Sequence, residues 1–267
     1  MDKWVLLLER KHLFDMKTLG RPIVLAPLYW VAFVLCFVAC GKEPSENHSS
    51  DAQEDTSTST FSISYNRKVY FAQGNLATHG RKFVLNPWDY GGYFGWGTGD
   101  KPGNNSMDNS QYPSFIDWGD YLNNAEEGWR TLEKAEWEYL LLYRKDAAFK
   151  QGTATVCGVH GMVLLPDRWQ VPEGMVFSPG CISWEDNVFT REQWERMGGK
   201  GAVFLPAGDY IWNGAPPHEG ASGLYCTATP VGDKEAYYVY FYDGRVYASV
   251  VNQRCFRLSV RLVRDVD

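Results

Sequence analysis

Residues 235–251 read EAYYVYFYDGRVYASVV, and we expect this stretch to decide the fold of the C-terminal part of the chain. Its side chains alternate in character on both sides of Asp243-Gly244, a dipeptide typical of a two-residue hairpin turn. The pattern therefore predicts a β-hairpin with three opposing pairs: Tyr242 and Arg245, Tyr240 and Tyr247, Tyr238 and Ser249.

The two faces of this hairpin differ in composition, because side chains alternate across a strand. One face has the apolar composition of a core: Tyr237, Val239, Phe241, Val246, Ala248 and Val250. The other face is rich in tyrosine: Tyr238, Tyr240, Tyr242, Arg245, Tyr247 and Ser249. Rigid tyrosine rings beside an arginine are typical of binding surfaces. The alternative is that cross-strand tyrosine pairs only stabilise an exposed sheet.

Helix signals and apolar runs precede the hairpin. Thr131 is expected to cap a helix that ends near Arg144, with Leu132, Ala135, Tyr139 and Leu142 at helical spacing. Thr190 is expected to begin a second helix, in which Gln193 completes a capping box and Gly198-Gly199 ends the helix. Strands or hairpins are predicted over 61–73, 161–166 and 202–206, and long loops over 87–120.

After the hairpin, a last strand is predicted to close the domain. Its apolar positions, Leu258, Val260 and Leu262, alternate with polar ones and are expected to point inward. The chain shows no internal repeat. One α+β domain over residues 61–267 accounts for these elements.

Several short segments spread over this domain form a set: 69–76 (VYFAQGNL), 94–99 (FGWGTG), 129–132 (WRTL), 136–141 (EWEYLL), 161–166 (GMVLLP), 201–206 (GAVFLP), 236–237 (AY) and 259–263 (SVRLV). As a set they resemble the C-type-lectin-like modules of Bacteroidota surface lipoproteins. Those modules are related to formylglycine-generating enzymes and to the variable proteins of diversity-generating retroelements.

The resemblance implies a C-type-lectin-like fold with two helices, a small twisted antiparallel sheet and long loops. It also implies that solvent-facing positions in the last strands and loops bind ligand. Carried over to this chain, those positions are Tyr238, Tyr240, Tyr242, Arg245, Tyr247, Ser249, Val251, Asn252 and Gln253.

The first forty residues have the pattern of an export signal. Basic Lys17 and Arg21 precede an apolar run that ends at Ala39-Cys40, and 37–40 (FVAC) resembles a bacterial lipobox. We expect residues 1–39 to be a lipoprotein signal peptide, Cys40 to be lipidated, and residues 40–60 to form a polar, flexible stalk. An uncleaved anchor helix is the alternative, and Met16 is an alternative start.

The dipeptide Lys42-Glu43 resembles the signal that sends Bacteroidota lipoproteins to the outer face of the outer membrane. The expected location is therefore the outer membrane, with a lipid anchor and the domain exposed at the cell surface. A membrane would be one partner, through the anchor. The other would be a protein or glycan on a host, phage or bacterial surface.

Charge and cysteine usage narrow the function further. The whole chain has a net charge of −6, and residues 1–39 contain five Lys/Arg and three Asp/Glu, so their removal leaves about −8. An acidic domain argues against a nucleic-acid partner. Four cysteines remain apart from Cys36 and Cys40, with three disulfide pairings open: Cys157, Cys181, Cys226 and Cys255.

The sequence favours a binding protein over an enzyme. It has no zinc-type Cys/His cluster, phosphate loop or catalytic-triad motif, so we expect no catalytic residue, no cofactor and no metal. A formylglycine-generating-type oxidase would need a close cysteine pair, but Cys226 and Cys255 are far apart in the sequence. The sequence is also compatible with calcium-dependent sugar binding and with a structural role in the envelope or fimbriae.

Overall fold

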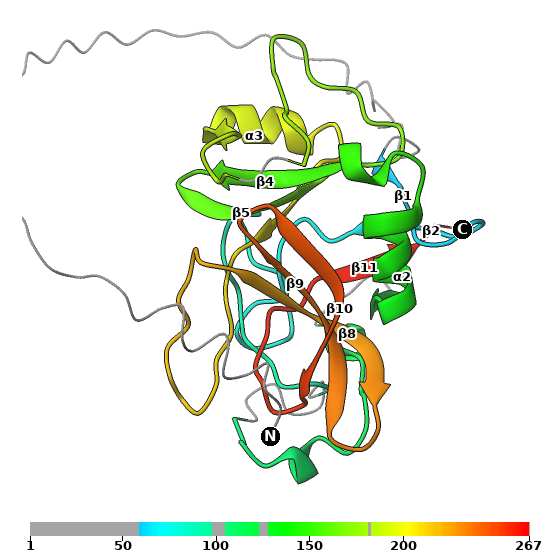
Figure 1. Ribbon diagram of the computed structural model, residues 1–267, viewed down its shortest axis with the longest axis vertical. Coiled ribbons are helices and arrows are strands. Elements are labelled where there is room, and N and C mark those ends of the chain that lie inside the picture. Colours follow the sequence, from blue (N-terminus) through cyan, green and yellow to red (C-terminus); the bar gives the residue numbers. More distant parts are fainter. Residues whose placement is uncertain (1–58, 98–104, 123–127, 181–182, 267) are drawn as a thin grey trace, which may run out of the picture. The chain divides into compact units, whose positions relative to one another are not determined.

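The computed structural model describes residues 59–97, 105–122, 128–180 and 183–266 (Figure 1). The predicted signal peptide, Cys40, Cys181 and most of the predicted stalk lie outside the described residues. The last two residues of the predicted stalk, Ser59 and Thr60, are described. Thr60 is buried, and its carbonyl oxygen accepts a hydrogen bond from the backbone N–H of Asp167 at 2.9 Å. The packed chain thus includes residue 60.

The strands of the described chain form three sheets. The first sheet has the strand order β1-β2-β11-β3 and contains β1 (Phe61–Ser62), β2 (Lys68–Phe71), β3 (Trp129–Thr131) and β11 (Leu262–Asp265). The hairpin sheet has the order β10-β9-β8 and contains β8 (Gly223–Val231), β9 (Glu235–Tyr242) and β10 (Arg245–Gln253). The middle sheet has the order β6-β4-β5-β7 and contains β4 (Gln151–Val156), β5 (Val159–Leu164), β6 (Val188–Phe189) and β7 (Val203–Pro206).

The helices of the described part are short. They are the α-helices α2 (Lys134–Glu138) and α3 (Arg191–Gly198), the π-helix η4 (Tyr139–Tyr143), and the 3₁₀ segments η2 (Asn109–Gln111), η3 (Trp118–Tyr121) and η5 (Ala147–Phe149). The predicted α+β, C-type-lectin-like class is therefore wrong, because three sheets with two short α-helices replace two helices on one small sheet. In β4 and β8, buried and exposed residues do not alternate along the strand, because most residues on both faces of these strands are buried.

The predicted helix over 131–144 differs most from its expected form. Thr131 lies in β3 and pairs with Leu262, so it does not cap a helix. Glu133 is the N-cap instead, in a capping box with Glu136. After five α-helical residues the chain continues as η4, in which the Arg144 N–H donates to the Tyr139 carbonyl oxygen at 2.7 Å. This i to i+5 bond is the mark of a π-turn.

Three other predictions made from local signals are confirmed. Phe61 pairs with Val69 in the hairpin predicted over 61–73. Helix α3 begins after Thr190 and has Gly199 as its C-cap. The two apolar runs predicted as buried strands form β5 and β7, which pair with each other antiparallel.

The Thr190 cap gives a first prediction for the stability of the domain. The Thr190 hydroxyl accepts from the Gln193 N–H at 3.3 Å, and the Gln193 side chain accepts from the Thr190 N–H at 2.8 Å. We expect Thr190→Ala to lower the free energy of unfolding by about 1 kcal/mol, measured by urea unfolding. Thr190→Ser keeps the acceptor and should match the wild type, and equal losses in both variants would contradict the role of the cap.

The segment predicted as the last strand is buried on both sides, although only its end belongs to β11. Leu258, Val260 and Leu262 are buried as predicted, but Ser259 and Arg261 are buried as well. The reason is that this segment lies between sheets: Ser259 forms a parallel bridge with Tyr225 of β8, and β11 pairs with β2 and β3. Polar residues here face protein and not water.

Within the ranges described above, no helix combines the length and the apolar composition that a membrane span requires.

Candidate functional site

The predicted hairpin is formed by β9 and β10, and its register is confirmed near the turn. Arg245 pairs with Tyr242, and Tyr247 pairs with Tyr240. Asp243 and Gly244 have φ values of 40° and 73°, as a tight hairpin turn with two left-handed residues requires. The long twisted pair of strands stands out in Figure 1.

A β-bulge makes the rest of the predicted register wrong. Ala248 and Ser249 together lie opposite Val239, so that Val250, and not Ser249, pairs with Tyr238. The bulge adds one residue to β10 and none to β9. Beyond the bulge, each side chain of β10 therefore lies on the opposite side of the sheet from the side that strict alternation predicts. The nine predicted ligand-binding residues therefore do not share one face.

Four of those residues form what we call the tyrosine surface: Tyr240, Tyr242, Arg245 and Tyr247. The ring centroids of Tyr240 and Tyr242 are 5.1 Å apart, those of Tyr240 and Tyr247 6.0 Å, and those of Tyr242 and Tyr247 6.2 Å. The Arg245 guanidinium lies 5.9 Å from the centroid of the Tyr242 ring. Each ring thus touches the other two, and Tyr247 is 43% exposed. The opposite face of the hairpin packs into the core through Val239, Phe241 and Ala248.

Tyr240 links the tyrosine surface to the loop before β8. Burial, together with the charges of Tyr242 and Asp209, raises the pKa of Tyr240 to about 12, against the effect of a hydrogen bond with Ser222, which lowers it. Asp209 is buried, and its carboxylate accepts from the Ser222 hydroxyl at 2.9 Å and from the His218 N–H at 2.8 Å. Because its pKa is raised, the phenol of Tyr240 stays protonated at neutral pH.

A second aromatic group adjoins this position, and we call Tyr210, Trp212 and Phe256 the aromatic platform. The rings of Trp212 and Phe256 stack with centroids 4.1 Å apart, and Tyr210 lies 5.5 Å from Phe256. Tyr210 is 38% exposed and also acts on the pKa of Tyr240. No sequence pattern singles out these residues, because they come from two separate loops without periodicity.

The remaining predicted site residues lie elsewhere. Tyr238 is buried, and its hydroxyl donates to the Gln253 carbonyl oxygen at 3.0 Å. Val251 pairs with Tyr237 and Gln253 with Glu235, which places both on the side of the sheet opposite the tyrosine surface. Ser249 lies in the bulge, and Asn252 pairs with Ala236 next to the buried Tyr238. Only the residues near the turn are brought together.

The cysteines are poorly suited to thiol chemistry. Cys157, Cys226 and Cys255 are free thiols, so no disulfide joins these three. Burial raises the pKa of Cys226 well above its ordinary value and also raises the pKa of Cys255. A raised pKa lowers the thiolate fraction, which is the nucleophilic form.

A cavity of about 230 Å³ lies between α3 and the loop before it, lined by Met175, Phe189 and Gln193 among others, and it contains none of the predicted site residues. Among the residues that the structure describes, no three His, Cys, Asp or Glu side chains gather as metal ligands would. Comparison with protein-family models, with curated proteins and with solved structures finds no match to this chain.

Proposed function

We propose that this protein is a surface-displayed, lipid-anchored recognition protein that binds a protein or glycan through the tyrosine surface and the adjoining aromatic platform. The observation that carries the proposal is the cluster of three mutually contacting tyrosine rings on the open face of a hairpin whose other face is core. Large rings with few rotatable bonds lose little entropy on binding, and tyrosine and arginine are enriched among the residues that dominate binding energy.

The surroundings of the rings support binding over a merely structural role. Cross-strand stabilisation needs only the pair Tyr240 and Tyr247, yet Tyr242 and Arg245 extend the same surface to the turn. The hydrogen bonds of Asp209 and Ser222 fix the loop beside Tyr240 before any ligand arrives. A surface that is already ordered loses less free energy when it binds.

The test of this function is a binding screen with the processed chain against glycans and envelope proteins. The screen is repeated with Tyr247→Ala. A ligand that binds the wild type and not the variant supports the proposal, whereas ligands that bind both equally place recognition elsewhere on the chain.

We also propose that the segment around the hairpin is the variable region of a diversity-generating retroelement. Genomic DNA provides the test, because such a region requires a nearby reverse transcriptase gene and a near-copy of the sequence encoding residues 235–263. Flanking DNA without both features would contradict this part of the proposal.

The anchor gives the next prediction. We expect Cys40→Ala to leave the protein unprocessed or to release it from membranes, because the thiol that would carry the lipid is gone. Membrane fractionation and the mass of the N-terminal peptide measure the outcome. Correct cleavage together with unchanged membrane attachment would contradict lipidation at Cys40.

A further inference from the structure

An apolar patch lies on the helical segment that follows α2. It consists of Leu142, Tyr143 and Phe149, which are 50%, 69% and 69% exposed. Leu142 and Tyr143 end η4, Phe149 ends η5, and these two elements are in contact. Three large apolar side chains gathered on one exposed segment suggest that something covers them.

Two of the three patch residues, Leu142 and Tyr143, end the π-helix η4. The extra residue in η4 buries Leu140 and Leu141 in adjacent positions, so Leu142 and Tyr143 turn outward. After Asp146, whose φ is 58°, η5 buries Ala147 and leaves Phe149 exposed. The backbone conformation of η4 and η5 thus keeps these apolar side chains on the surface. Apolar side chains in such positions are not covered by the domain itself.

Positive charge adjoins the patch. Lys145 is exposed, and the ammonium group of Lys150 donates to the Lys145 carbonyl oxygen at 3.0 Å. Of the nearby carboxylates, Glu138 is paired with Lys134 at 2.7 Å and Asp167 with Lys68 at 3.1 Å. Asp146 is exposed beside Lys145, so the two lysines leave one net positive charge next to the patch. Apolar side chains flanked by lysines are the composition of segments that lie in the interface of an anionic membrane.

The patch also lies close to the point where the N-terminal tether joins the domain. Arg144, next to Tyr143, has its guanidinium 5.6 Å from the centroid of the Phe61 ring and 3.5 Å from Asp167. The backbone N–H of Asp167 in turn donates to the carbonyl oxygen of Thr60, and the Asp167 carboxylate accepts from the hydroxyl of Ser62. Strand β1 contacts η4, and Figure 1 shows β1 beside this helical segment. For comparison, any flexible chain of about twenty residues has a root-mean-square span of roughly 25 Å.

We propose that Leu142, Tyr143 and Phe149, with Lys145 and Lys150, dock on the anionic phospholipid surface to which the protein is tethered. The inference rests on the lipid anchor of the proposed function. The tether keeps the patch at high effective concentration near the bilayer, so three apolar side chains suffice to hold the domain on the lipid surface. They would not suffice for a second copy of the chain, because a stable protein interface involves about 20–30 residues on each side.

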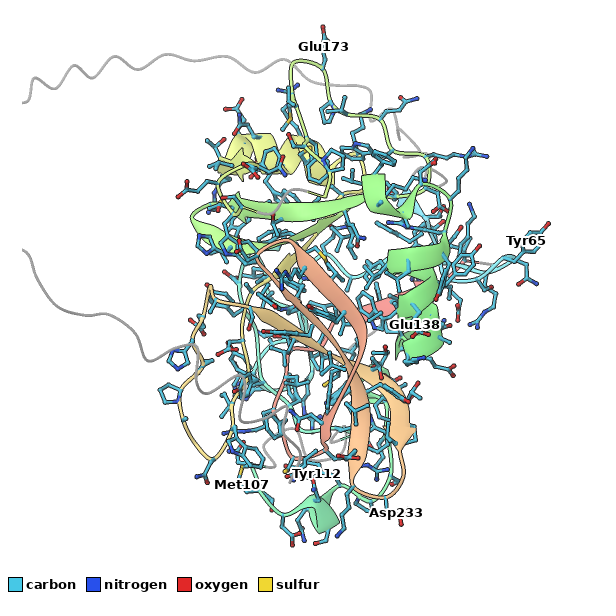
Figure 2. The ribbon with its side chains drawn as sticks, viewed as in Figure 1. Tyr65, Met107, Tyr112, Glu138, Glu173 and Asp233 are labelled. Carbon is cyan, nitrogen blue, oxygen red and sulfur yellow. The ribbon has the colours of Figure 1, made fainter. Side chains whose placement is uncertain are left out.

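The experiment uses the lipidated chain in vesicles of phosphatidylethanolamine and phosphatidylglycerol. An environment-sensitive fluorophore is attached to Phe149→Cys in a Cys181→Ser background, since burial raises the pKa of the remaining described thiols and slows their labelling. The matched control carries the fluorophore at Asp233→Cys, in the turn between β8 and β9, which Figure 2 shows well separated from Glu138. Only protein that floats with the vesicles is measured.

We expect blue-shifted emission and quenching by spin-labelled lipids at position 149 but not at position 233. Lys145→Gln in the Phe149→Cys chain should shift the equilibrium away from the docked form about fivefold, as expected for one lysine near an anionic surface. Equal signals at both positions, or no blue shift at 149 in floated protein, would overturn docking while leaving the anchor intact. A blue shift without vesicles that grows with protein concentration would assign the patch to a second copy and also overturn it. Failure to float at all would contradict the anchor and, with it, this inference.

Discussion

Replacing Arg261 with Met should lower the free energy of unfolding by at least about 3 kcal/mol, the largest stability effect that we expect from a single substitution. Arg261 is fully buried between the first and middle sheets without a carboxylate partner. Its Nε donates to Asn75 Oδ1 at 2.9 Å, and its two Nη atoms donate to the carbonyl oxygens of Ala72, Gln73 and Phe204. Methionine fills similar space but leaves these acceptors buried without donors.

The guanidinium group holds distant segments together. Ala72 and Gln73 follow β2, and Phe204 is in β7, so one side chain joins the first sheet to the middle sheet. Burial lowers the pKa of Arg261 to about 10, and Tyr225 acts in the opposite direction, so the group remains charged at neutral pH. Hydrogen bonds from a charged donor contribute more than neutral ones.

Thermal unfolding followed by circular dichroism measures this effect. For a domain of this size, 3 kcal/mol corresponds to a fall in Tm of roughly 6–12 °C. Arg245→Met removes an exposed arginine and should change stability by no more than about 0.5 kcal/mol. If Arg261→Met unfolded within 1 kcal/mol of the Arg245→Met control, the proposed role of the buried hydrogen bonds would be wrong.

Replacing Tyr247 with Ala should weaken ligand binding by at least about 30-fold, or 2 kcal/mol, while stability changes by about 1 kcal/mol or less. Tyr247 contacts both Tyr240 and Tyr242 and is half-exposed, so it presents a large ring to a ligand without anchoring the core. Tyr240→Ala should also abolish binding, but it is the less clean variant because the Tyr240 ring is partly buried against the core.

Val251→Ala is the matched control for Tyr247→Ala. Val251 is 40% exposed on the same strand but lies on the other side of the sheet, beyond the bulge. Its replacement should change affinity less than about threefold. Isothermal titration with the ligand found in the screen measures both variants. Equal losses would mean that the ligand contacts both sides of β10 and that the bulge does not divide the site.

The sequence predicted those parts of the site that depend on neighbours along the chain. Asp243-Gly244 determines the turn, and the turn determines the first two cross-strand pairs, because each pair follows from the last by one step on both strands. The Thr190 capping box was predictable for the same reason, since both of its hydrogen bonds join residues three positions apart. Strands β5 and β7 were visible as continuous apolar runs.

Tertiary contacts decided the rest. With the bulge at Ala248 and Ser249, Ala248 packs in the core with Val239 and Phe241. No local pattern in the sequence predicts this extra residue. Tyr238 is buried because Leu224, Cys226 and Leu258 pack around it, and Arg261 is buried because four acceptors from other segments surround it. These environments exist only once distant segments meet.

The same distinction between local and tertiary determinants applies to the whole protein. By itself the sequence determined the acidic charge, the hairpin and the tyrosine composition of one of its faces, since these depend on composition or on residues close together in the chain. The export and anchoring pattern of residues 1–40 stays a prediction. Only the tertiary structure decided that the fold has three sheets, that the rings of Trp212 and Phe256 stack, and that Leu142 and Tyr143 are exposed. The physical reason is that burial and register are set by the free energy of packing between remote segments, which local patterns do not contain.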